Sequence, residues 1–415
     1  MQHTLSRNTL ILLLSNTGSA VLSFVLSVAI GRVLGKEGLG IYTTALAWVF
    51  PLSLAAEFGL GTLITREAAR NPALERDYLQ VAAQARLWFG GGLTVILILC
   101  APLLSSDPLV VRGLQISAPL ILINPLFGNF TAIFRARQQM WPIPWLNIGM
   151  LAAQIILTIT IFLLDGDVLA ALIVNTLTSA GQLCAAWWIW RRWFNPNTRN
   201  DKGENERHLQ LIVTLKQAWP FAAAAILAAI QLRLAPIMLE RMTDAGDVGY
   251  YAAATRFAEA GRTVPNALFG ALFPALAVLA AQPASLNRQM QKILIGLGIF
   301  ATLLGIVFWF LARPTLGFTY GPDFIDAAAT LQLTMWGLLP GLLRAGLTLY
   351  WYAKGRETLT NKVLVLMLGL QLGFGLWLIP IWGALGAAAA VAITELAGMI
   401  LLILPLRHQD NHENV

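Results

Sequence analysis

About twelve apolar runs, each roughly long enough to cross a bilayer, follow one another along the chain. A hydrocarbon core about 30 Å thick requires roughly 20 apolar residues per helix, and charges, Pro or Gly clusters bound each run. The runs cover residues 10–33, 42–64, 81–104, 113–134, 143–164, 168–190, 213–239, 250–279, 293–311, 327–351, 359–381 and 384–406. The alternating short strands of an outer-membrane barrel are absent. The sequence therefore predicts an all-α integral membrane protein with about twelve transmembrane helices.

The composition excludes an ordinary soluble fold. Hydrophobic residues make up 57% of the 415 residues, charged residues only 12%, and the mean hydropathy is +0.67. The first run is too long for the apolar region of a signal peptide, and a charged, Gly-rich turn follows it instead of a cleavage site. We therefore interpret it as the first transmembrane helix.

One polar connector divides the predicted helices into six and six. It covers residues 191–216 and is rich in charges, Asn, Pro and Gly, which is typical of a mobile loop. The predicted organisation is an N-terminal six-helix lobe, a cytoplasmic linker, a C-terminal six-helix lobe and a cytoplasmic tail. Their bounds are 1–193, 194–212, 213–406 and 407–415.

An internal repeat relates the two predicted lobes. At an offset of 209 positions, four residues of the turn after the first helix fall on identical residues of the second half without gaps. The matched pairs are Arg32 and Arg241, Gly40 and Gly249, Tyr42 and Tyr251, and Ala45 and Ala254. Six helices per copy keep both copies in one orientation, so we expect two pseudo-symmetric lobes around a central cavity.

The basic residues predict the orientation. With the N-terminus inside, inner loops, tails and helix ends hold about 19 of the 28 Lys and Arg, and outer loops hold about five. The inner group includes Arg7, the arginines from Arg66 to Arg86, Arg135, Arg137, those in 191–216, Arg288, Lys292, those in 354–362 and Arg407; the outer group is Arg32, Lys36, Arg112, Arg241 and Arg313. Both termini are therefore predicted to be cytoplasmic. The net charge of +7 favours contact with anionic membrane lipids and not with nucleic acid.

Four short segments resemble one transporter family. These segments are GRVLGKEGLGIY at 31–42, EFGLGTLITRE at 57–67, GYYAAATRF at 249–257 and PNALFGALFPAL at 265–276. They resemble the Wzx-type oligosaccharide flippases, which are polysaccharide biosynthesis proteins of the multidrug/oligosaccharidyl-lipid/polysaccharide (MOP) exporter superfamily.

The resemblance implies a function in the cell inner membrane. We expect a flippase that translocates polyprenyl-diphosphate-linked oligosaccharide by alternating access, for the synthesis of O-antigen, capsule or exopolysaccharide. A polysaccharide polymerase of the same pathway is a candidate partner. Alternatives are an ion-coupled multidrug/cation antiporter of the same superfamily and a lipid II flippase. The energy source stays open between membrane potential, protons, sodium and consumption of the product.

Ionisable residues inside the apolar runs are the candidate site residues, because a charge at the bilayer centre costs at least about 2.5 to 3.5 kcal/mol. The candidates are Arg233, Arg256, Arg262, Arg344, Glu57 and Glu259; Glu395 is a further charge inside a run but is not a candidate. Arg256, Glu259 and Arg262 are spaced i, i+3, i+6, which places all three on one helix face. We expect Arg256 and Arg262, with Arg233, to bind the diphosphate of the lipid carrier, because guanidinium groups match phosphate oxygens in pairs.

The remaining charged residues leave alternatives open. Glu259 either keeps the empty site neutral or bridges its two arginines structurally. Arg344 is expected either in the cavity or anchored near an edge. Glu57 is a candidate for the cavity wall or for a coupling-ion contact, and its structural alternative is an interhelical hydrogen bond. Glu395 is expected to serve packing.

Catalysis and cofactors are not expected. The segment GRVLGK at 31–36 is one residue short of a phosphate-binding loop and is followed by Glu37 instead of Ser or Thr. His408 and His412 have helical spacing but lie in a polar tail, so no metal site is predicted. Every predicted outer loop is too short to hold the catalytic groups of a membrane glycosyltransferase. The chain is therefore predicted to be a transporter that is not an enzyme.

Overall fold

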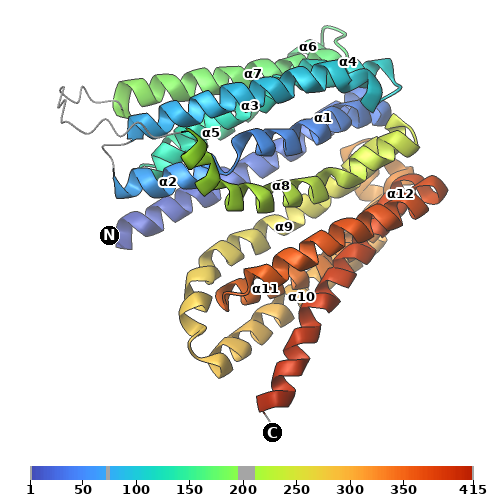
Figure 1. Ribbon diagram of the computed structural model, residues 1–415. Helices are drawn as coiled ribbons and strands as arrows, with labels where there is room; N and C mark the ends of the chain where they lie inside the picture. The colour runs from blue at the N-terminus through green and yellow to red at the C-terminus, as the bar shows by residue number, and fades with distance from the viewer. Residues whose placement is uncertain (1, 72–74, 195–210, 414–415) are drawn as a thin grey trace, which may run out of the picture. The chain divides into compact units, whose positions relative to one another are not determined.

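Helices make up all the regular structure that the computed structural model describes, which covers residues 2–71, 75–194 and 211–413 (Figure 1). The α-helices are α1 Gln2–Glu57, α2 Leu60–Arg70, α3 Glu75–Leu104, α4 Pro108–Ser117, α5 Leu120–Ala136, α6 Pro142–Phe162, α7 Val168–Ile189, α8 Leu211–Met242, α9 Ala245–Leu279, α10 Pro283–Thr319, α11 Ala328–Ala353 and α12 Glu357–Glu413. A π-helical turn η2, Trp190–Phe194, follows α7, and a 3-10 turn η3, Pro322–Ala327, precedes α11. The predicted all-α fold is confirmed.

The two longest helices each contain a break at a glycine. Gly35 in α1 has φ 68°, and Gly383 in α12 has φ 53°, so both residues adopt a backbone conformation that glycine tolerates best. Gly35 lies between the predicted runs 10–33 and 42–64. Gly383 lies between 359–381 and 384–406. Each long helix is therefore two successive spans, as the sequence predicted.

Within the residues that the structure describes, seven helical stretches are long and apolar enough to cross a membrane. They are Ile11–Arg70, Glu75–Leu104, Pro108–Ala136, Pro142–Phe162, Val168–Phe194, Ala284–Thr319 and Glu357–Pro405. The predicted runs outside these stretches lie in α8, α9 and α11, which carry the interior charges of Arg233, Arg256 and Arg344. Many large apolar side chains point outward, including Leu103 and Phe310, as expected for a surface that faces lipid.

The helices pack into two compact units that exchange parts of the chain. Unit 1 comprises Met1–Leu26 and Thr44–Arg233, and unit 2 comprises Ser27–Thr43 and Leu234–Val415. Both α1 and α8 therefore contribute residues to both units. The predicted lobe bounds stay a prediction, and most of the predicted linker, residues 195–210, lies outside the described residues.

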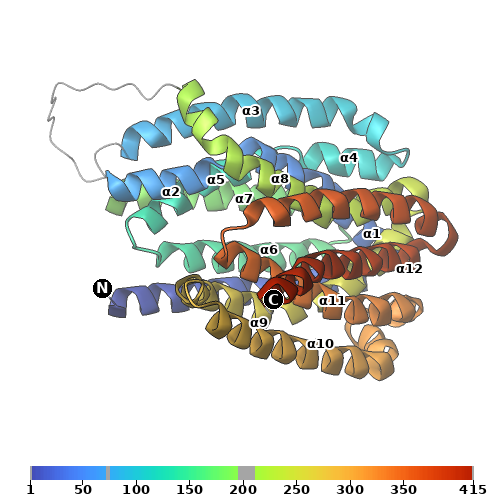
Figure 2. The same ribbon diagram turned by 60° about the horizontal axis from the view of Figure 1, so that its bottom comes forward.

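Each unit is organised around one central helix. In unit 1, α5 packs against α2, α3 and α7, and small and aliphatic residues fill the space between α2, α3 and α5. In unit 2, α11 packs against α9, α10 and α12 (Figure 2). Trp351 on α11 is fully buried and donates from Nε1 to the carbonyl of Leu402 at 3.0 Å, which fixes α11 to α12. These two central helices position the charged residues described below.

Two glycines of the internal repeat meet in unit 2. A Cβ on Gly40 would overlap the carbonyl oxygen of Ala245, and a Cβ on Gly249 would overlap the carbonyl oxygen of Lys36. The contact is reciprocal, because the offset of 209 that relates Gly40 to Gly249 also relates Lys36 to Ala245. Only glycine allows both backbones to approach this closely. The two copies of the repeated turn therefore contact each other at these two glycines.

Substitution of Gly249 tests this contact. We expect Gly249→Ala to lower the free energy of unfolding by about 1–3 kcal/mol, because the added methyl group overlaps backbone that cannot turn away. The melting temperature of the purified protein in detergent measures the effect. Gly296→Ala is the matched control, since a Cβ there meets nothing within 4 Å. Equal melting temperatures for the two variants would contradict the close approach.

Candidate functional site

A break within the predicted second span forms the first charged site, in unit 1. Phe58 and Gly59 both have positive φ, 51° and 67°, between the end of α1 and the start of α2. A positive φ is costly for a bulky residue such as Phe58 and requires support from its surroundings. The Phe58 ring stacks on Phe89 of α3 at 5.8 Å between centroids. The break leaves Glu57 at the last position of α1, facing α3.

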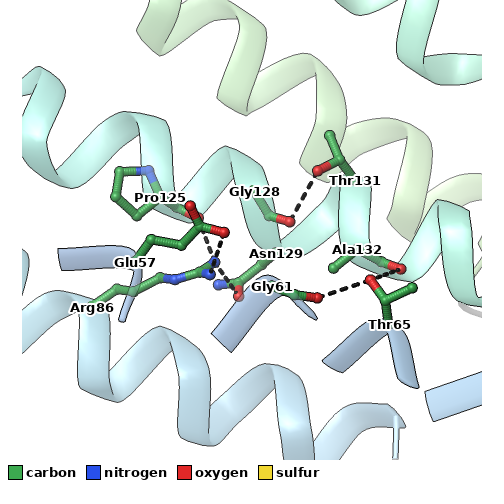
Figure 3. Close-up of polar contacts among 9 residues, drawn as sticks. All are labelled: Glu57, Gly61, Thr65, Arg86, Pro125, Gly128, Asn129, Thr131 and Ala132. Atoms are coloured by element: carbon green, nitrogen blue, oxygen red, sulfur yellow. Dashed lines mark hydrogen bonds and ion pairs between the residues drawn. The ribbon is translucent and has the colours of Figure 1, made fainter. Parts of the chain in front are cut away.

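Arg86 of α3 lies opposite this break and is fully buried (Figure 3). Its Nη1 donates to the carbonyl of Pro125 and to Oδ1 of Asn129, both on α5. Its Nη2 lies 4.0 Å from Oε1 of Glu57, a side chain that is 33% exposed. We call Arg86, Glu57 and Asn129 the Arg86 cluster. It joins α1, α3 and α5 through one guanidinium group.

The guanidinium of Arg86 is only partly satisfied. Within the described residues, its Nε and Nη2 have no hydrogen-bond partner. Buried donors that lack partners are unusual in native proteins and occur at functional sites or where water binds. A small movement of Glu57 would let its carboxylate accept from Nη2 directly. The cluster therefore has a second available arrangement, with a net charge of zero in both.

A paired charge on one helix forms the second site, in unit 2. Arg256 donates from Nη1 to Oε2 of Glu259 at 2.8 Å, one turn along α9. The side chains are 25% and 41% exposed, so the pair is accessible at least in part. The sequence spacing predicted that these two side chains lie on one helix face, and in the structure they form an ion pair.

A third charged site joins α9, α11 and α12 of unit 2. Arg344 of α11 donates from Nε and Nη2 to the carboxylate of Glu395 on α12, the latter at 3.2 Å to Oε1. A methyl group on Gly341 would lie 3.6 Å from Oε2 of Glu395 and 3.7 Å from Nη2 of Arg262. The Arg262 guanidinium and the Glu395 carboxylate, which holds Arg344, therefore both approach one glycine. We call Arg262, Arg344, Glu395 and Gly341 the Arg344 cluster.

Arg233 is assigned to unit 1, unlike the other three arginines that the sequence proposes for the site. It is the last residue of unit 1, and its guanidinium lies over the ring of Phe50 at 5.0 Å from the centroid. A cation over an aromatic face is attracted by the electrons of the ring. Arg256 and Arg262 belong to unit 2, so the meeting of all three arginines at one diphosphate stays a prediction.

A family model for polysaccharide biosynthesis proteins matches residues 5–280. The chain belongs to this family. The matched region covers both units in part and includes Glu57, Arg86, Arg233, Arg256 and Arg262. No curated protein has a matching sequence.

Solved structures show that this polysaccharide biosynthesis protein has the fold of the MOP superfamily. The lipid II flippase MurJ in an inward closed conformation is 16% identical with a TM-score of 0.78, over 95% of this chain and 87% of that chain. An inward-facing multidrug resistance MATE family transporter is 12% identical with a TM-score of 0.76, over 94% of each chain. A MOP superfamily transporter from Pyrococcus furiosus, whose binding pocket is described as having reverse polarity, is 12% identical with a TM-score of 0.64. Its match covers 98% of this chain and 95% of that chain.

The polysaccharide biosynthesis protein differs from the sequence-based expectation at Arg86. We counted Arg86 with the cations of inner loops and helix ends and did not predict its complete burial, for which α5 supplies the acceptors. The available signal was the position of Arg86 within the apolar run 81–104. Glu395, expected to serve packing, is the carboxylate that Arg344 contacts. Glu57 faces Arg86 across helices at 4.0 Å, which is an ion-pair contact and not the interhelical hydrogen bond of its structural alternative.

No metal centre is indicated in the part of the chain that the structure describes. It contains no group of three or more His, Cys, Asp or Glu that could hold a metal ion. The charged sites of this polysaccharide biosynthesis protein are built from arginine and glutamate, and guanidinium groups bind anions.

Truncation of Asn129 tests the Arg86 cluster. We expect Asn129→Ala to lower the free energy of unfolding by about 1–3 kcal/mol, because a fully buried guanidinium loses one of its acceptors. The melting temperature in detergent is the measurement. Asn124→Ala is the matched control, since Asn124 is an exposed asparagine on the same helix. If both variants have the melting temperature of the wild type, the hydrogen bond from Arg86 to Asn129 does not stabilise the protein.

Proposed function

We propose that this protein is a flippase for polyprenyl-diphosphate-linked oligosaccharides in the cell inner membrane. The observation that carries the proposal is the surplus of positive charge in the Arg344 cluster, where Arg344 pairs with Glu395 and Arg262 adds a second cation nearby. A positive surplus inside transmembrane helices is costly without an anionic ligand to balance it. The diphosphate of a lipid-linked oligosaccharide is such a ligand, and its lipid and sugar ends suit a protein of this family.

The chemistry of arginine supports this choice of ligand. A guanidinium group donates two parallel hydrogen bonds to two oxygens of a phosphate, and it stays charged inside a protein. Arg256 and Arg262 lie on one face of α9, so they approach a ligand from one helix, with Glu259 holding Arg256 in place. Arg233, over Phe50, is the third proposed contact. Glu57 is proposed as a coupling or cavity-wall residue.

Two other cargoes remain candidates. The likeness to the lipid II flippase MurJ favours lipid II, which also carries a diphosphate. The likeness to MATE family transporters favours a cation antiporter, which requires a negative site. The Arg86 cluster is neutral and the Arg344 cluster is positive, so the described charges favour an anionic cargo. Alternating access would deliver the sugar head to a polymerase on the outer side of the membrane.

A translocation assay tests the proposal. The full chain is reconstituted in liposomes with a fluorescent polyprenyl-diphosphate oligosaccharide, and the head groups that reach the opposite leaflet are counted. We expect movement with the wild type and at least a tenfold loss of rate for Arg262→Ala, which corresponds to about 1.4 kcal/mol of lost phosphate binding in the rate-limiting state. Arg256→Ala and Arg233→Ala should also lose rate. Arg313→Ala, an exposed arginine at the end of α10, is the control.

The cargo panel separates the alternatives. Lipid II and a cationic dye are offered in parallel vesicles under the same imposed potential. If lipid II moves faster than every polyprenyl-diphosphate oligosaccharide, lipid II is the cargo and the proposed cargo is wrong. Transport of the dye alone would establish an antiporter. Equal rates for Arg262→Ala and the wild type would remove Arg262 from the binding site.

A further inference from the structure

Glu395 and Arg344 are held together by the packing of α11 against α12. A Cβ on Gly398, one turn after Glu395, would lie 2.7 Å from Cδ of Arg344, so the arginine stem crosses α12 at this glycine. From there its guanidinium reaches the carboxylate with two nitrogens. Glu395 is only 11% exposed at its side chain and Arg344 is 23% exposed. The pair is therefore built into the helix contact and is not a chance meeting on the surface.

Arg262 adds a second cation that the pair does not neutralise. Its Nη2 and Oε2 of Glu395 would lie 3.7 and 3.6 Å from a Cβ on Gly341, so both border the position that this side chain would occupy. Within the described residues, no ion pair or hydrogen bond joins the Arg262 guanidinium to another group. The space is kept open because position 341 has no side chain. An oxygen placed there would be close to both arginines and would compete with Glu395 for Arg344.

We propose that Glu395 is a resident counter-ion for Arg344 that a phosphate group of the lipid-linked diphosphate displaces. This inference rests on the proposed function and assigns the phosphate to the space between Arg262 and Arg344, above Gly341. In the empty protein the carboxylate occupies the guanidinium fork. When cargo binds, phosphate oxygens take its place, because a guanidinium group accommodates either anion in the same paired geometry.

The exchange gives the empty protein a stable resting state. Without Glu395, two arginines inside transmembrane helices would stand without a carboxylate, which is costly. With it, the bound diphosphate can leave while the carboxylate returns to Arg344. Glu395 therefore weakens cargo binding and speeds release. The pair of Arg256 and Glu259 is a less suitable place for this exchange, because its side chains are 25% and 41% exposed and lie on one helix, whereas those of Arg344 and Glu395 are 23% and 11% exposed and join two helices.

The first test measures binding of farnesyl diphosphate to the full-length protein in detergent by thermophoresis. We expect Glu395→Gln to bind this probe about tenfold more tightly, because it removes a negative charge a few Å from the phosphate while keeping the shape of the side chain. Gly341→Ala should bind about tenfold more weakly, since its methyl group fills the space at ordinary contact distances and leaves the fold intact. Gly369→Ala on α12, where an added Cβ would meet nothing within 4 Å, should bind as the wild type does.

Two further ligands identify what the site recognises. Farnesol lacks the phosphates, so its affinity should be the same for all variants. Inorganic diphosphate should bind at least tenfold more weakly than farnesyl diphosphate; equal affinity would mean that the site takes a free anion, and would overturn the assignment to a lipid head group. Glu259→Gln is the comparison for a paired carboxylate on α9. If Glu259→Gln binds farnesyl diphosphate more tightly and Glu395→Gln does not, the carboxylate that the phosphate displaces is Glu259 at Arg256, and the proposal for Glu395 is wrong.

A translocation assay separates this inference from the proposed function. In liposomes with the lipid-linked oligosaccharide, Glu395→Gln should move cargo at a rate at least fivefold below the wild type, because tighter binding slows release. Wild-type transport with unchanged affinity and rate in both Glu395→Gln and Gly341→Ala would end the inference and leave the function intact. A wild type that neither binds farnesyl diphosphate nor moves the oligosaccharide would end both.

Discussion

A charge inside a transmembrane helix is costly unless another group offsets it, and for Arg86 and Arg344 that group lies on another helix. Arg86 of α3 reaches Glu57 of α1 and acceptors on α5. Arg344 of α11 reaches Glu395 of α12. Hydrocarbon offers no hydrogen bonds, so each partner also fixes how its helices pack. The charged clusters therefore contribute both to helix packing and to the binding of any ligand, so a substitution in a cluster changes both.

Most of the helical fold could be predicted because membrane thickness sets the length of an apolar run. The breaks at Gly35 and Gly383 lie between predicted runs, where charge or glycine already interrupts the pattern. The break at Phe58–Gly59 was not predicted, because Glu57 and Gly59 stand inside an apolar run that resumes at Leu60. Its stability comes from the stacking on Phe89 and from the facing Arg86, which only the packed structure reveals.

The candidate site was predictable only where partners are close in sequence. Arg256 and Glu259 are three positions apart on one helix, so their pairing follows from helix geometry. Arg344 and Glu395 are 51 positions apart, and no periodicity states which faces of two helices meet. Arg86 was missed for a related reason. It follows several inner-loop arginines in the sequence, and its acceptor Asn129 lies 43 positions away.

The internal repeat explains why the two halves need not bind cargo alike. Gly40 and Gly249 match because each backbone must pass the other copy, a requirement that applies equally to both. At the same offset of 209, however, Arg256, Glu259 and Arg262 fall on Ala47, Phe50 and Ser53. The charges of α9 thus have no counterpart in the first half, so symmetric packing does not require them. A lipid-linked diphosphate has one anionic point, and a single positive cluster in one half is sufficient to bind it.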